Sequence, residues 1–235
     1  MLYVTSDLHG FPPEALQQLL AKADFTERDE LIVLGDVIDR NGDGGIATRR
    51  WMMRQRNVRM ILGNHERMML RCAFVLDPVT EHALADETRL ALLSTWLDNG
   101  AEPTLRSLRA LRMENPQEAA DVFSFVARAP RYALVRAGSR SFLLTHAGLG
   151  HLSPGKPLDA YTEEDLLWNR PSLTDSYFGD VFTVFGHTPV AYYGAQYRGK
   201  MLLTRTWADI DTGAAMGAYP MLLRLQDMQP FYVDA

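Results

Sequence analysis

Acidic and imidazole side chains recur in this sequence directly after short apolar runs, at points where a strand would end. Asp7 and His9 follow the first run, Asp36 follows the second, and Asn64 and His65 follow the third. Two positions apart in an extended chain, Asp7 and His9 point to the same side. One carboxylate and one imidazole so placed can hold a single metal ion. The pattern therefore predicts metal-assisted chemistry at the ends of strands.

Two further histidines stand after later apolar runs and enlarge the set of candidate metal ligands. The oxygen and imidazole donors are then Asp7, His9, Asp36, Asn64, His65, His146 and His187. Such donors suit manganese, iron or zinc rather than calcium, and without thiolates they do not indicate a structural zinc. Seven donors are more than one ion needs. The set therefore predicts a site for two divalent ions that share a bridging carboxylate.

The apolar runs before these residues predict the strands of an α/β fold. In the first half we expect strands at 2–5, 31–34 and 58–62 and helices at 14–23 and 46–55. In the second half we expect a helix at 162–168 and strands at 132–135, 141–145, 181–185, 201–204, 207–210 and 221–225. Ligands of α/β sheets bind just beyond the carboxyl ends of the strands. The polar loops are therefore expected to meet at one site.

Residues 66–130 lose the strand pattern and are predicted to form a helical insert, with helices at 67–76, 81–97, 103–113 and 116–128. Arg106, Arg109 and Arg112 recur every three residues; they indicate either a solvated helix face, which is the favoured interpretation, or a basic rim that docks acidic substrate. Because both ends of the insert adjoin the polar loops, we expect it to arch beside or over the site as a lid. His82 has no motif around it and is expected at the surface.

The composition limits the class of protein. A length of 235 residues suits one domain over 1–235, and 47% hydrophobic residues exclude a disordered chain. The net charge of −5 argues against duplex nucleic acid as a partner, and no apolar run approaches the ~18 residues of a membrane span. The single cysteine, Cys72, cannot form an intramolecular disulfide and lies among apolar neighbours. The apolar neighbours predict a buried thiol. The single cysteine and the lack of a signal peptide predict a cytoplasmic location.

Five motifs, in this order, resemble the signature of the PPP-type metallophosphoesterases, and among these the bacterial and phage protein phosphatases. The motifs are Asp7-Leu8-His9, Gly35-Asp36-Val37-Ile38-Asp39-Arg40, Gly63-Asn64-His65-Glu66, His146-Ala147-Gly148 and Gly186-His187-Thr188. The resemblance implies a calcineurin-like metallophosphoesterase fold, with a central β-sandwich of mixed sheets flanked by helices. Family members usually carry glycine where this chain has Asn41. Because asparagine tolerates a left-handed backbone, Asn41 is expected to keep the loop shape.

The resemblance also implies a role for each site residue. The first metal ion would be held by Asp7, His9 and Asp36. The second would be held by Asp36, Asn64, His146 and His187. His65 would be the general acid, oriented by Asp39. The phosphate oxygens would be bound by Arg40, Arg170 and Asn64. Glu66 is expected to orient its loop rather than to touch substrate.

The activity implied by the resemblance is metal-dependent hydrolysis of phosphomonoesters on a phosphorylated protein or peptide, at serine or threonine and also at tyrosine. A metal-bridging hydroxide would attack phosphorus, with two manganese ions as the expected cofactors and iron or zinc as alternatives. A second interpretation is a hydrolase of diadenosine polyphosphates or other nucleotides, which shares the core motifs but looks to have Gln at the position of His9. A silent phosphoprotein-binding scaffold is a third, but it would be expected to have lost ligands.

Overall fold

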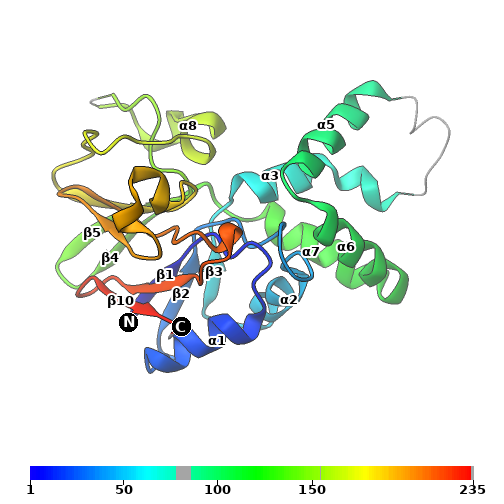
Figure 1. Cartoon of the computed structure of the whole chain (residues 1–235), viewed down its shortest axis with the longest axis horizontal. Coiled ribbons are helices and arrows are strands. Elements are labelled where there is room, and N and C mark those ends of the chain that lie inside the picture. The colour runs from blue at the N-terminus through cyan, green and yellow to red at the C-terminus, as the bar shows by residue number, and fades with distance from the viewer. Residues whose placement is uncertain (78–85, 154, 234–235) are drawn as a thin grey trace.

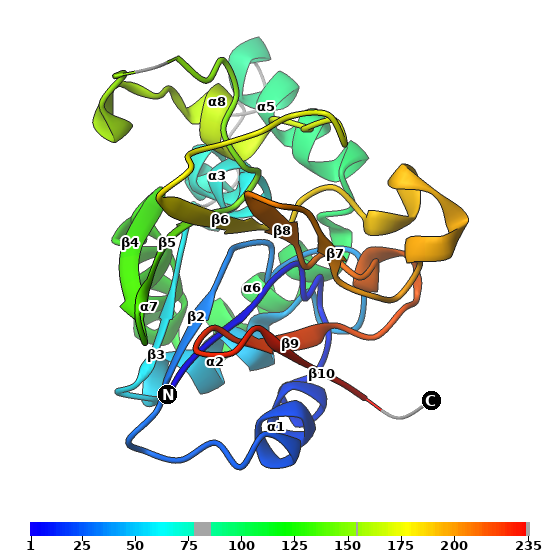
Figure 2. The same ribbon diagram turned by 90° about the vertical axis from the view of Figure 1, so that its left-hand side faces the viewer.

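The structure, a computed structural model, describes residues 1–77, 86–153 and 155–233. Within these residues, two five-stranded sheets pack face to face, and helices lie outside them (Figures 1 and 2). Each sheet contains both parallel and antiparallel pairs. The predicted fold class, a β-sandwich of mixed sheets flanked by helices, is confirmed.

The first sheet has the order β10–β9–β1–β2–β3, in which β1, β2 and β3 are parallel. Its strands are β1 (Leu2–Thr5), β2 (Glu30–Val33), β3 (Val58–Met60), β9 (Met221–Arg224) and β10 (Gln229–Tyr232). Side chains alternate across a strand. Val4 of β1 therefore packs between the sheets, whereas Tyr3 packs in the cluster that contains Leu16 and Leu19 of α1 (Pro13–Lys22).

The second sheet has the order β4–β5–β6–β8–β7, with β5, β6 and β8 parallel. Its strands are β4 (Tyr132–Ala137), β5 (Arg140–Thr145), β6 (Val181–Phe185), β7 (Leu202–Leu203) and β8 (Trp207–Asp209). Phe142, Leu144 and Val184 join Val4 and Ile32 in one buried cluster, which is the core between the two sheets.

Helices cover the outer faces of the sandwich. Besides α1, the first sheet is covered by α2 (Ile46–Arg54), whose Met52 packs in one cluster with Leu31. The helix α8 (Glu163–Leu167) begins with a capping box formed by Thr162 and Asp165. Short 3₁₀ helices are η1 (Ala73–Leu76), η2 (Leu158–Ala160), η3 (Val190–Tyr193), η4 (Ala195–Tyr197) and η5 (Ala214–Met216).

The helical insert projects from one side of the sandwich (Figure 1). Its helices are α3 (Asn64–Arg71), α5 (Glu87–Asp98), α6 (Glu102–Glu114) and α7 (Pro116–Ala127). Trp96, Leu108 and Val122 join these helices in one buried cluster. The predicted helix 67–76 begins three residues earlier, at Asn64, and ends in a 3₁₀ turn. His82 and the start of the predicted helix 81–97 lie outside the described residues.

The chain does not end at the predicted strand 221–225. After a tight turn, β10 pairs antiparallel with β9 at the edge of the first sheet. Proline at position 230 lacks a backbone N–H group, which an edge strand tolerates. None of the described helices is long and apolar enough to cross a membrane.

Candidate metal centre

The polar residues that follow the strands meet between the two sheets. Asp7 follows β1, Asp36 follows β2 and Asn64 opens α3 after β3, all in the first sheet. His146 and His187 follow the parallel strands β5 and β6 of the second sheet. These residues, together with His9 and His65, are at most 7% exposed. All seven donors predicted from the sequence therefore come together in one buried cluster.

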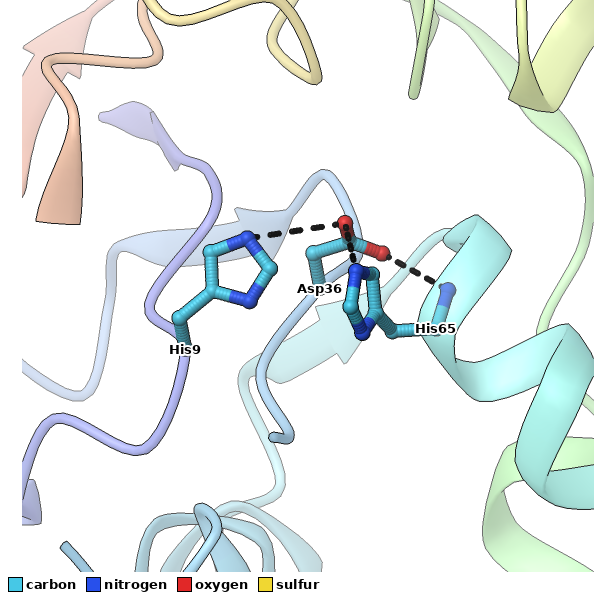
Figure 3. Close-up of side chains that lie close together, drawn as sticks. All are labelled: His9, Asp36 and His65. Atoms are coloured by element: carbon cyan, nitrogen blue, oxygen red, sulfur yellow. Dashed lines mark hydrogen bonds and ion pairs between the residues drawn. The ribbon is translucent and has the colours of Figure 1, made fainter. Parts of the chain in front are cut away.

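Asp36 lies at the centre of the cluster. His9 Nε2 is 3.7 Å and His65 Nε2 is 3.8 Å from Asp36 Oδ2. Figure 3 shows the two imidazole rings on either side of this carboxylate. His146 Nε2 is 3.4 Å from the other carboxylate oxygen. Two groups of three residues could each hold an ion, one made of Asp36, His9 and His65 and the other of Asp36, His146 and His187. Asp36 is the residue that the two groups share.

Backbone carbonyls determine how two of the imidazoles present their nitrogens. Nδ1 of His146 lies 2.7 Å from the carbonyl oxygen of Leu34, and Nδ1 of His9 lies 3.2 Å from that of Ile38. An imidazole that donates its Nδ1–H group keeps a lone pair on Nε2. Both Nε2 atoms face the carboxylate of Asp36. Both rings are therefore oriented as metal ligands.

Asn64 joins the second group through its side-chain oxygen. Asn64 Oδ1 lies 2.8 Å from His146 Nε2 and 3.1 Å from His187 Nδ1. Asp7 connects the sheets, because its Oδ2 accepts a hydrogen bond of 2.9 Å from the backbone N–H of His187. Among the described residues, no hydrogen-bond donor reaches the other carboxylate oxygen of Asp7, and none reaches His187 Nε2, although both atoms are buried.

The electrostatics of the cluster fit divalent cations. Burial raises the pKa of Asp7 to about 6 and lowers the pKa of His9 to about 3. Burial also acts to lower the pKa of His146, but the carboxylates of Asp36 and Asp7 and the carbonyl of Leu34 together outweigh it and raise that pKa to about 10. The Asp36 carboxylate therefore stabilises a positively charged group placed beside it. Buried carboxylate, amide and imidazole donors, two of them with an atom that has no partner among the described residues and none of them a thiolate, form a set suited to manganese, iron or zinc.

His65 is held from the side opposite the metal ligands. Its Nδ1 lies 2.6 Å from Asp39 Oδ2. Asp39 in turn accepts hydrogen bonds from the indole N–H of Trp96 at 2.8 Å and from the hydroxyl of Thr104 at 2.5 Å. Burial acts to lower the pKa of His65, but the carboxylates of Asp36 and Asp39 outweigh it and raise that pKa. The histidine is thus oriented and kept able to carry a proton.

Two arginines lie at the same pocket as His65. Arg40 Nη2 is 3.3 Å from His65 Nε2, and its backbone N–H donates to the carbonyl of Gly100 in the insert. Arg170 donates to the carbonyl of His187 at 3.5 Å and to the hydroxyl of Thr188 at 3.4 Å. Both guanidinium groups line the pocket above Asp36 and Asn64. They are therefore placed to bind an anion there.

Glu66 holds the two loops that carry the donors. Its carboxylate accepts hydrogen bonds from the backbone N–H groups of Asp36 at 2.8 Å, Val37 at 2.9 Å and Gly63 at 3.2 Å. It also accepts one at 2.6 Å from Arg49 of α2, and both members of this ion pair are fully buried. Glu66 acts as the sequence predicts, by orienting the loops.

Sequence reasoning missed several residues of the site. One of them is Arg49. Its spacing of three residues from both Ile46 and Met52, on the buried face of α2, was the signal that could have indicated its burial. Asp211, which is 2% exposed, also lines the pocket, together with Asn99 of the insert. Both residues lie in stretches that resemble the family, 210–213 and 96–100, but the sequence did not indicate a role for either of them.

The backbone of the site loops departs from ordinary conformations. Non-glycine residues with positive φ include Asp7 (52°), His9 (43°), Asp36 (53°), Asp39 (76°), Arg40 (71°) and His187 (69°). Asn41, which was expected to supply a left-handed conformation, is not among the residues with positive φ. Its side chain instead donates to the carbonyls of His9 at 2.9 Å and Ala214 at 3.3 Å, so it ties two loops together. Gly63 is required for close approach, because a Cβ there would collide with the Asp36 carboxylate.

Comparison with known proteins gives matches over most of the chain. The profile of the calcineurin-like phosphoesterases matches residues 1–211. Serine/threonine-protein phosphatase 1 of Salmonella typhimurium is 28% identical over 235 residues, which cover 96% of this chain and 92% of the relative. A symmetrical bis(5'-nucleosyl)-tetraphosphatase of Acidovorax sp. is 38% identical over 74 residues, 31% of this chain and 26% of the relative. The solved structure of a candidate diadenosine tetraphosphatase shares the fold, with a TM-score of 0.67 at 19% identity over 99% of this chain and 92% of that one.

Proposed function

The chain belongs to the calcineurin-like phosphoesterases, and from this premise we propose that it is a metal-dependent phosphoprotein phosphatase. The proposed substrates are phosphomonoesters of serine, threonine and tyrosine side chains. The observation that carries the proposal is the position of Asp36, which belongs to two donor groups and lies beside the His65–Asp39 pair. A relative matched over nearly the whole chain, from Salmonella typhimurium, is a serine/threonine-protein phosphatase.

We propose that Asp7, His9 and Asp36 hold one divalent ion and that Asp36, Asn64, His146 and His187 hold a second. In the first of these sites Asp7, which has a buried carboxylate oxygen without a hydrogen-bond donor in the described part of the chain, would take the place of His65, because His65 would serve as the proton donor. Manganese is the proposed metal, with iron or zinc as alternatives. When bound, the two ions would supply charge neutralisation and activation of water near neutral pH.

The remaining residues would bind the phosphate and move a proton. Arg40 and Arg170 present guanidinium groups that match phosphate oxygens in pairs. His65 would donate the proton that the leaving alkoxide or phenoxide needs. Asp39 would keep His65 in the required tautomer, and Trp96 and Thr104 would keep Asp39 in place. With Cys72 buried, the chain needs no oxidising compartment, and a cytoplasmic location is proposed.

Hydrolysis of dinucleoside polyphosphates is the second candidate, because the partial relative of 38% identity is a tetraphosphatase. A substrate panel separates the two functions. Protein stripped with a chelator and reloaded with manganese is given phosphoseryl, phosphothreonyl and phosphotyrosyl peptides and diadenosine tetraphosphate. We expect phosphate release from the peptides that depends on manganese and is lost in Asp36→Asn. Cleavage of the dinucleotide alone would overturn the proposal in favour of the second candidate.

A further inference from the structure

Large apolar side chains lie exposed at the mouth of the pocket. Trp168 is 36% exposed and Tyr192 is 67% exposed, and both line the pocket that contains His65 and Arg170. Exposed apolar residues scattered singly over a surface are normal, whereas a group at the edge of a pocket indicates binding. We name Trp168 and Tyr192 the aromatic rim. The polar pocket is thus bordered by two rings that belong neither to the proposed metal ligands nor to the groups proposed to bind phosphate or donate a proton.

The aromatic rim adjoins the proposed phosphate-binding groups directly. The guanidinium carbon of Arg170 lies 5.9 Å from the centroid of the Tyr192 ring. The Trp168 ring lies 6.1 Å from the His187 ring at an angle of 84°. A phosphate held by Arg170 would therefore have an aromatic surface beside it, without a spacer in between.

Short structured segments hold both rings in place. Trp168 ends α8, where its backbone N–H donates to Glu164, and Tyr192 lies in η3, where its backbone N–H donates to Pro189. In the part of the chain that the structure describes, neither the indole N–H nor the phenol hydroxyl has a hydrogen-bond partner within the protein. The two rings are therefore preorganised and available to a ligand.

Building on the proposed function, we propose that the aromatic rim is a subsite for the aromatic leaving group of an aryl phosphomonoester such as phosphotyrosine. In an aryl ester the ring is bonded to the phosphate oxygen, so it stays within the pocket that His65, Trp168 and Tyr192 line together. In a phosphoserine ester only a methylene group occupies this position. In a nucleotide the ribose separates the base from the phosphate, so the base would extend past the rings nearest to Arg170.

The test compares two peptides of one sequence that carry phosphotyrosine or phosphoserine at the same position. Replacing either ring, by Trp168→Leu or Tyr192→Leu, should lower the ratio of kcat/KM for the tyrosine peptide over the serine peptide by roughly 3–10-fold, the value of one aromatic contact. Tyr192→Phe, which keeps the ring, should leave this ratio close to that of the wild type. Tyr219→Leu is the matched control, because Tyr219 is 51% exposed but does not line the pocket.

A binding measurement supports the kinetics without turnover. Calorimetric titration with phenylphosphonate and methylphosphonate should show that Trp168→Leu loses affinity for the phenyl compound and not for the methyl compound. Equal changes for both peptides and both phosphonates would overturn the subsite, while the proposed function would stand. A wild-type protein that cleaves only diadenosine tetraphosphate, with losses in the rim variants, would overturn both the proposed function and the subsite for an aryl group, and would assign the rings to the dinucleotide.

Discussion

Replacing Arg49 by methionine, which has a similar length but no charge, should weaken the fold and the metal centre together. The ion pair between Arg49 Nη2 and Glu66 Oε1 is 2.6 Å long and fully buried. Glu66 also accepts the backbone N–H groups of Asp36, Val37 and Gly63. Without the guanidinium, Glu66 would be an unpaired buried charge, and it is the group that holds the Asp36 loop.

The size of the effect follows from the burial. Removing one partner of a buried ion pair costs about 3–5 kcal/mol, because the remaining charge is uncompensated. For a domain of this size each kcal/mol shifts the unfolding midpoint by about 2–4 °C, so Arg49→Met should lower the Tm of the metal-free protein by roughly 6–20 °C. Since both donor groups contain Asp36, affinity for manganese should fall as well, by roughly 10–100-fold, as for other groups that orient metal ligands.

Thermal unfolding in a chelator gives the stability, and calorimetric titration with manganese gives the affinity. Arg50→Met is the matched control. Arg50 follows Arg49 on α2, but its partner Glu118 lies on α7, and both side chains are partly exposed. This control should cost about 1 kcal/mol or less and leave manganese affinity unchanged. An Arg49→Met protein with reduced Tm but wild-type manganese affinity would refute the role of the pair in positioning Asp36. An unchanged Tm would refute the argument from the buried charge.

Three further outcomes are expected. Asp36→Asn should lower the metal content found by elemental analysis well below two ions per chain, and retention of two ions would contradict its shared position. His65→Asn should keep the metal content but lower turnover of alkyl phosphates by roughly 10²–10⁴-fold, with a smaller loss on p-nitrophenyl phosphate, whose leaving group hardly needs a proton. Equal losses on both esters would argue against an acid role. Replacing Arg106, Arg109 and Arg112 by glutamine should change the KM for an acidic phosphopeptide by less than about twofold. These charges are exposed or, for Arg112, partly exposed, such charges contribute little, and none of the three lines the pocket. A large rise in KM at low salt would show that this face of α6 docks substrate.

The positions of several site residues could be predicted from two features, an apolar strand pattern that ends at a polar residue and the parallel arrangement of neighbouring strands. A run such as Phe142–Thr145 has the apolar character of a buried strand, and the polar residue after it must leave the sheet at its carboxyl end. Because β5 and β6 are parallel, His146 and His187 then emerge at the same edge. In the first sheet, Asp36 likewise follows the carboxyl end of the parallel strand β2 and meets the two histidines there.

Contacts between distant segments could not be predicted in this way. Trp96 lies 57 positions from Asp39, and the resemblance of residues 96–100 to bacterial family members did not indicate that its indole bonds to that carboxylate. Strand β10 was missed because Pro230 and Gln229 weaken the strand pattern, and its pairing with β9 overrides that weakness. Arg49 was missed because an arginine within a helix normally points to solvent, as its neighbour Arg50 partly does, and only the position of Glu66 explains the burial of Arg49.

The left-handed backbone at six of the site residues has a consequence for how this protein would evolve under selection for heat resistance. A non-glycine residue in that conformation costs roughly 1–2 kcal/mol relative to its ordinary backbone. Glycine would relieve this cost at each position but would remove a metal donor, the carboxylate that orients His65 or an anion-binding group. A library screened for thermal stability alone should therefore accumulate glycine or asparagine at these positions first. Selection that also requires turnover should leave them intact and place its stabilising changes elsewhere.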